Sequence, residues 1–214
     1  MNMIASMEQL DGRIYLSGVS WNTYQSLRNA DENDHLRMTY DRGALEIMSP
    51  SSKHELISYL FGRMVDQWTL HFEIDIRSGR NTTFRRKDLE RGLEPDNCYW
   101  ITHERQMRGK DEVNLRRDPP PDLVLEVDVS WSSIPKLPIY AAMGVPEVWH
   151  WNDDDMLEVL RLAKGQKYKA SKDSRELPKF PFAFATSLIH RRQILSDTQI
   201  VKEFIHSISS KSRP

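Results

Sequence analysis

The chain has 214 residues, of which 39% are hydrophobic and 29% charged, and this length and composition are expected of one soluble globular domain. The formal net charge of −1 excludes a global basic signature for nucleic acid, so such a partner would need a local basic patch. The single Cys98 excludes an internal disulfide, and no apolar run approaches the roughly 20 residues that span a bilayer. Because the N-terminus also lacks a signal-peptide pattern, we expect a cytoplasmic protein without a membrane partner.

The first part of the chain predicts a strand, a helix and a β-hairpin. A short strand is expected at residues 13–16, and Ser20 is expected to cap a helix at residues 21–30. The segments LRMTY and ALEIM flank a glycine-containing turn at residues 41–43. Apolar segments on both sides of such a turn predict an N-terminal β-hairpin.

The next segment is the clearest helix of the sequence. Apolar residues recur at helical spacing from Leu56 to Trp68. Ser52 and Glu55 form a predicted capping box, in which each side chain satisfies a backbone amide at the helix start. This structural role accounts for Glu55. The spacing gives no role to His54, and a lone histidine is more often structural than catalytic.

Strands separated by polar and basic segments follow this helix. Alternation in FEIDIR predicts a strand at residues 72–77, and TTFRR predicts a second at residues 82–86. The segment LEPDNCYWI predicts a strand that begins at Pro95 and carries Asp96. After three consecutive prolines, the apolar run LVLEV predicts a buried strand at residues 123–127.

The last third predicts a helix, a meander of strands and a final helix. Ser132 and Ser133 are expected to cap a helix that ends at Gly144, or else Pro138 makes this helix start later or distorts its first turn. Strands are then expected at residues 146–151, 156–162 and 167–170, with a C-terminal helix at about 196–209. The predicted fold class is α/β (mixed α+β), as a single domain over residues 1–214.

Three carboxylates lie on or beside otherwise apolar strands: Asp96, Asp122 and Glu126. A buried charge is costly unless a partner or a metal ion neutralises it, and Mg²⁺ prefers oxygen ligands from one or two carboxylates. In the alternative interpretation, each acid lies at a strand end and is solvated or paired with arginine. Asp122, next to Pro121, fits this alternative best, whereas Glu126 fits it worst because apolar residues flank it.

Basic side chains offer a second kind of candidate. Lys136 follows Glu126 by ten residues and would stabilise negative charge at the end of the strand, unless it is simply a solvated charge. Basic residues also gather on both sides of Asp96, where they either hold phosphates or form a solvated surface. The candidates for nucleic-acid contact are Arg80, Arg85, Arg86 and Lys87.

Four segments in this order resemble the Uma2 family (domain of unknown function 820), in particular its cyanobacterial members: YDRGALEIMSPSSKHE, GLEPD, PPPDLVLEVDVS and IYAAMGVPEVWHW. The resemblance runs from about Met38 to about Trp151. That family is placed in the PD-(D/E)xK restriction-endonuclease-like superfamily. The resemblance therefore implies a central mixed β-sheet flanked by helices, with a core at about residues 36–185.

The resemblance also implies site residues. The first superfamily acid corresponds to Asp96 of EPD and the second to Glu126 of LVLEV, and these two would hold the metal ion. An acid from the preceding helix corresponds to Glu55. The superfamily lysine, normally two residues after the glutamate, is replaced here by Asp128, and the resemblance transfers its role to Lys136.

The implied activity is that of an endonuclease that uses Mg²⁺ (or Mn²⁺) to hydrolyse phosphodiester bonds and leaves a 5′-phosphate. Nucleic acid is the expected partner, DNA in the first place, and a homodimer is an expected assembly. The alternatives are a catalytically inactive module of the same fold that binds nucleic acid or a protein, and a metal-dependent hydrolase of another phosphoester.

Overall fold

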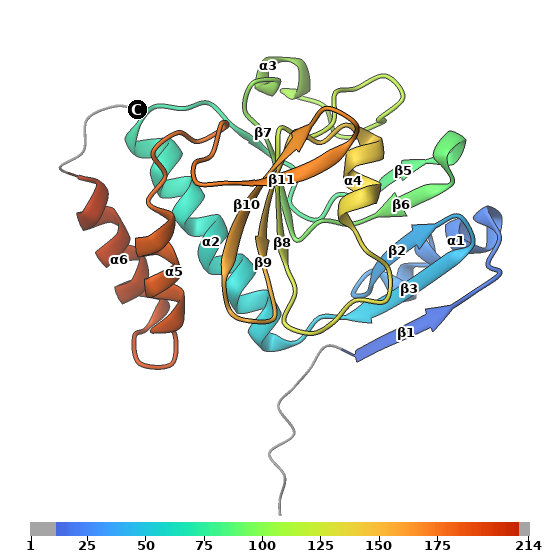
Figure 1. Ribbon diagram of the computed structural model, residues 1–214, viewed down its shortest axis with the longest axis horizontal. Coiled ribbons are helices and arrows are strands. Elements are labelled where there is room, and N and C mark those ends of the chain that lie inside the picture. Colours follow the sequence, from blue (N-terminus) through green and yellow to red (C-terminus); the bar gives the residue numbers. More distant parts are fainter. Residues whose placement is uncertain (1–11, 210–214) are drawn as a thin grey trace, which may run out of the picture.

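The computed structural model describes residues 12–209, which form two β-sheets and the helices packed around them (Figure 1). The N-terminal segment on which the expected lack of a signal peptide rests lies mostly outside these residues. In the part of the chain that the structure describes, every helix is too short or too polar to cross a lipid bilayer.

The larger sheet has six strands in the order β11-β10-β9-β8-β7-β4. It is mixed, because β8 and β9 are parallel while the other neighbours are antiparallel. Its strands are β4 (Arg77–Ser78), β7 (Asn97–Trp100), β8 (Leu123–Val127), β9 (Glu147–Trp151), β10 (Leu157–Ala163) and β11 (Lys167–Ser171).

Helices cover both faces of this sheet, and Figure 1 shows α2, α5 and α6 together on one side and α4 on the other. The side chains of β8 alternate between the two cores: Leu125 packs with α2 and Val124 packs with α4. The helices are α2 (Ser52–His71), α4 (Leu137–Met143), α5 (Phe182–His190) and α6 (Asp197–Ile208). Because β8 is buried from both sides, Glu126 is also buried.

The smaller sheet is antiparallel, with strand order β1-β3-β2-β6-β5. It contains the expected hairpin and packs against the first helix through a cluster of aromatic rings. Its elements are β1 (Gly12–Leu16), α1 (Trp21–Arg28), the 3₁₀ turn η1 (Asp31–Asn33), β2 (Arg37–Asp41), β3 (Ala44–Ser49), β5 (Phe84–Arg86), η2 (Lys87–Leu89) and β6 (Arg91–Leu93). The short helix α3 (Glu104–Met107) follows β7.

The mixed α/β fold class is therefore confirmed, but three local predictions are wrong. The segment 72–77 does not form a strand: α2 continues to His71, and the chain then turns through Glu73, whose φ is +52°. Only Arg77 and Ser78 at its end pair with β7. The apolar alternation of the segment reflects Ile74 and Ile76 packing on the core without a strand partner.

The two other errors concern helix caps. Ser51, not Ser52, caps α2, and its hydroxyl accepts the amide of His54, so the predicted capping box with Glu55 does not form. Helix α4 begins only at Leu137, with a proline in its first turn. The two serines expected to cap it, at positions 132 and 133, bind a carboxylate of β3 instead.

Candidate active site

The candidate site lies where β7 and β8 run side by side. β7 begins at Asn97 and not at Pro95 as expected, so Asp96 lies just before the strand. Because Asn97 pairs with Leu125 in antiparallel register, Asp96 lies next to the position of Glu126 in β8. Asp96 is tied directly to β8, because its Oδ2 accepts the backbone amide of Val127 at 2.7 Å. The two carboxylates are 8% and 2% exposed, which places both in the interior of the fold.

Helix α4 supplies two donors to Glu126. The Lys136 ammonium lies 2.5 Å from Oε2, and the Tyr140 hydroxyl donates to Oε1. These residues are four positions apart at the start of α4, so they face the same side and reach one carboxylate together. Burial raises the pKa of the Tyr140 hydroxyl well above its usual value, so the group remains a donor at neutral pH.

The pKa values of Glu126 and Lys136 are shifted by burial and by the neighbouring charges. Burial raises the pKa of Glu126 to about 7, because the opposing effect of Lys136 is offset by the nearby carboxylates of Asp96 and Asp128. Burial would lower the pKa of Lys136, but the carboxylates of Glu126, Asp128 and Asp96 outweigh this effect and raise the pKa above its usual range. Lys136 is therefore a fixed cation, while Glu126 changes charge near neutral pH.

Asp96 has a partner from the start of α2. The Nε2 atom of His54, a fully buried residue, lies 2.8 Å from Oδ1 of Asp96. Burial acts to raise the pKa of Asp96, but the charge and hydrogen bond of His54 outweigh it and hold the pKa below its usual value. His54 thus keeps Asp96 ionised and fixes its orientation.

A second set of charges lies beside Lys136. Asp128, two residues after Glu126, is 3.8 Å from the Lys136 ammonium and 3.0 Å from Nε2 of His150. Arg13 of β1 lies 3.5 Å from Asp128 and 2.7 Å from Glu46 of β3. The smaller sheet therefore contacts the segment between β8 and α4 through charged side chains.

Glu46 holds this segment in place. Its side chain is 2% exposed, and its Oε2 accepts the backbone amide of Ser133 at 2.5 Å. Its Oε1 accepts the hydroxyl of Ser132 at 2.9 Å. Because Lys136 follows three residues later, these bonds fix the backbone from which its side chain reaches Glu126.

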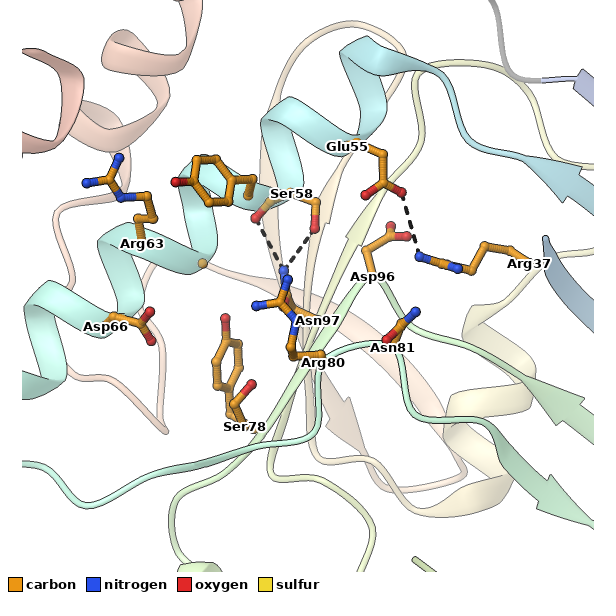
Figure 2. A pocket seen from close by; sticks show the side chains of 13 residues that line it. Arg37, Glu55, Ser58, Arg63, Asp66, Ser78, Arg80, Asn81, Asp96 and Asn97 are labelled. Carbon is orange, nitrogen blue, oxygen red and sulfur yellow. Dashed lines mark hydrogen bonds and ion pairs between the residues drawn. The ribbon is translucent and has the colours of Figure 1, made fainter. Parts of the chain in front are cut away.

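A polar cavity of about 270 Å³ opens beside Asp96, between α2, β7 and the segment after β4 (Figure 2). Neither Glu126 nor Lys136 lines it. Asn97 forms part of its wall, where its side-chain amide donates to the carbonyl and the hydroxyl oxygen of Ser58, at 3.2 and 2.8 Å. Asp96 lines the cavity and also lies next to Glu126, so it connects the cavity with the buried pair of Glu126 and Lys136.

The remaining predicted site residues lie farther from the buried pair. Glu55 lines the cavity and is 57% exposed, with an ion pair of 3.6 Å to Arg37 (Figure 2). Arg80 also lines the cavity. Arg85 donates to the side chain of Asn29. The other two basic candidates belong to the smaller sheet and its 3₁₀ turn, where Arg86 pairs with Asp88 and Lys87 is exposed.

The donor set suits a divalent cation by type. Asp96, directly before β7, and Glu126 of β8 offer carboxylate oxygens, and Mg²⁺ commonly binds through one or two carboxylates and keeps several waters. Among the described residues there is no group of three or more potential ligands. Each carboxylate already accepts hydrogen bonds from the protein, so an added ion would share its oxygens with Lys136, Tyr140 or His54.

Comparison with known proteins places the chain in a family. The model of the family Uma2, described as "Putative restriction endonuclease", matches residues 21–187. The chain belongs to the Uma2 family. A solved structure described as a putative nuclease of the domain-of-unknown-function family 820, from Anabaena variabilis, has a similar fold, with a TM-score of 0.51 and 14% sequence identity. The similarity covers 87% of this chain and 99% of that one. No curated protein matches the chain.

Membership of Uma2 agrees with the resemblance seen in the sequence, but the sequence patterns missed several residues of the site. Tyr140 could have been found, because it lies one helical turn after Lys136. His54 and Glu46 carried no such signal, since their partners lie 42 and 87 residues away along the chain. Asp122 is structural, and its Oδ2 accepts the backbone amides of Ile101 and His103.

Proposed function

We propose that this chain is an endonuclease that hydrolyses phosphodiester bonds of nucleic acid, DNA in the first place, with a divalent cation held by Asp96 and Glu126. The observation that carries the proposal is the position of Asp96 directly before β7 next to Glu126 of the neighbouring β8, with Lys136 bonded to Glu126. Membership of a family described as "Putative restriction endonuclease" supports it.

The reaction adds water to phosphorus and breaks the bond from phosphorus to the 3′ oxygen, so the products carry a 5′-phosphate and a 3′-hydroxyl. A bound Mg²⁺ or Mn²⁺ would lower the pKa of a water ligand and offset charge on the phosphate. Lys136 keeps its proton, so its ammonium stabilises negative charge rather than acting as a base. Glu126 has a pKa of about 7 without a cation and must lose its proton to bind one, so cation binding should strengthen as the pH rises through 7.

Two further residues orient the acids. His54 holds one oxygen of Asp96, and the amide of Val127 holds the other. The Tyr140 hydroxyl and the Lys136 ammonium each hold one oxygen of Glu126. Fixed carboxylates require little rearrangement during the reaction, which is the basis of electrostatic preorganisation.

One observation favours the second candidate, an inactive module that binds nucleic acid or a protein. Glu126 and Lys136 are buried and do not line the cavity beside Asp96. In this interpretation the charged pair supports the fold, and the basic residues Arg80, Arg85, Arg86 and Lys87 bind the partner.

A cleavage assay with and without Mg²⁺ separates the two candidates. Single-stranded and duplex DNA are incubated with the wild type, Asp96→Asn and Glu126→Gln, and circular dichroism checks that each variant is folded. We expect Mg²⁺-dependent cleavage by the wild type and its loss in both variants. Cleavage that persists unchanged in a folded variant would remove that residue from the site, and a wild type that binds without cutting would establish the inactive module.

A further inference from the structure

We propose that the cavity beside Asp96 binds one unpaired nucleotide of a single strand, with its phosphate on Arg80 and its base against Tyr59. This inference rests on the proposed function and specifies the form of the substrate. Both residues line the cavity, together with Asp96, so the bound nucleotide would lie next to a candidate catalytic carboxylate.

Two arginines of the cavity can bind an anion. Three arginines line the cavity, and one of them, Arg37, is paired with Glu55. Of the three carboxylates that line the cavity, Glu55 is paired with Arg37, Asp96 is hydrogen-bonded to His54, and Asp66 is influenced by the charge of Arg80. Within residues 12–209, Arg63 and Arg80 form no direct ion pair with a carboxylate, so both guanidinium groups can bind a phosphate. Figure 2 shows Arg80 extending from its segment toward α2.

The backbone holds Arg80 at this place. A Cβ on Gly79 would lie 2.6 Å from Sγ of Cys98 and 2.6 Å from a ring carbon of Trp100, so only glycine lets the chain pass this close to β7. Arg80 then adopts a φ of +47°, which is uncommon for a residue with a side chain. The arginine therefore projects from a constrained segment.

An aromatic surface lies on the α2 side of the cavity. Tyr59 is 48% exposed, and the Arg63 guanidinium lies over its ring at 5.6 Å from the centroid. Exposed aromatic rings and arginine planes are the surfaces on which single-stranded nucleic acids stack their bases. Ser58 and Asn97, which also line the cavity, supply polar groups between this surface and Asp96.

The size of the cavity excludes a base pair. A volume of about 270 Å³ is near the lower limit of small-molecule sites, roughly 300 Å³, and suits one nucleotide. Within a duplex, both faces of a base are covered by its neighbours, so a paired base could not reach Tyr59. We therefore expect single strands, or unpaired positions within duplexes, to bind in preference to continuous duplex.

The test is a binding measurement that does not depend on cleavage. A fluorescent 12-nucleotide single-stranded DNA is titrated with full-length protein in EDTA, and anisotropy gives Kd as a function of salt. The variants are Tyr59→Ala and Arg80→Asn, since asparagine tolerates the left-handed backbone. The matched controls are Tyr15→Ala, at a tyrosine of β1 that is 51% exposed, and Arg105→Ala, at an exposed arginine of α3.

We expect Tyr59→Ala to weaken binding by about 5- to 100-fold, the range for loss of one stacked base. Arg80→Asn should weaken binding and reduce the salt slope by about 0.7, the value for one phosphate contact on a single strand. The controls should bind as the wild type does, and a duplex of the same sequence should bind more weakly than the single strand.

The outcomes separate this inference from the proposed function. Wild-type affinity in both variants would overturn the nucleotide site, even if the wild type cleaves DNA with Mg²⁺. Preference for duplex over single strand would also overturn it. A wild type that neither binds nor cleaves nucleic acid would overturn the site and the proposed function together.

Discussion

Replacement of Glu126 by glutamine should change how the stability of the fold depends on pH. The folded-state pKa of Glu126 is about 7, against an ordinary value of 4.5, because burial and the neighbouring carboxylates outweigh Lys136. The folded state therefore keeps a proton on Glu126 between these values, while the unfolded chain has released it. The stability that this proton contributes is complete below pH 4.5 and is lost as the pH rises through 7.

The size of the effect follows from the same pKa values. Each pKa unit corresponds to about 1.4 kcal/mol, so the rise from 4.5 to about 7 is worth about 3 kcal/mol. Glutamine does not titrate, and the remaining groups are common to both proteins. Between pH 5 and pH 8, which covers most of this range, the wild type should thus lose about 2.5 kcal/mol of unfolding free energy relative to Glu126→Gln.

Urea denaturation in EDTA at several pH values between 5 and 8 measures this difference. The unfolding free energies of the wild type and of Glu126→Gln are compared at each pH, with Glu203→Gln, a half-exposed glutamate of α6, as the control. Curves for the wild type and Glu126→Gln that run parallel over this range would refute the raised pKa. They would also remove the expected strengthening of cation binding as the pH rises through 7.

Two other substitutions test the packing and the charges around the site. Gly79→Ala should lower the unfolding free energy by about 1–3 kcal/mol, since the new methyl group would lie 2.6 Å from the buried Cys98. The control Gly62→Ala lies in α2, and its methyl group would have its nearest contact at 3.5 Å. This control should be neutral or stabilising by up to about 1 kcal/mol. Equal urea midpoints for these two variants would contradict this. Glu46→Ala should cost about 3–5 kcal/mol, because it removes a carboxylate, 2% exposed, that is paired with Arg13 and accepts hydrogen bonds from Ser132 and Ser133. A thermal unfolding temperature like that of the wild type would contradict it.

Local patterns predicted much of this fold because burial imposes a period on the sequence. The apolar spacing predicted α2 and the apolar run predicted β8, because both elements face a core. The same reasoning failed at residues 72–77, where alternate side chains face a core although the backbone has no strand partner. Alternation reports which side is buried, and does not report hydrogen bonding to a neighbouring strand.

The candidate site was predicted less completely, and for a physical reason. Residue spacing alone grouped Asp122 with Glu126, whereas the pairing of Glu126 with Asp96 came from the family resemblance. In the structure, the register of β7 and β8 places Asp96 next to Glu126, and their joint role stays a prediction. The partners that orient the acids, His54 above all, come from elements distant in sequence, and no periodicity within one segment encodes such contacts.

Calorimetric titration with Mg²⁺ tests the central claim, that Asp96 and Glu126 form a cation-dependent centre. The titration is made on the full-length wild type, Asp96→Asn, Glu126→Gln and the control Glu203→Gln, each checked for folding by circular dichroism. We predict binding by the wild type and the control, weakened at least about tenfold in both site variants, since loss even of an outer-shell partner costs about 10–100-fold. Equal Mg²⁺ affinity in all four proteins, or no binding by the wild type, would contradict the claim.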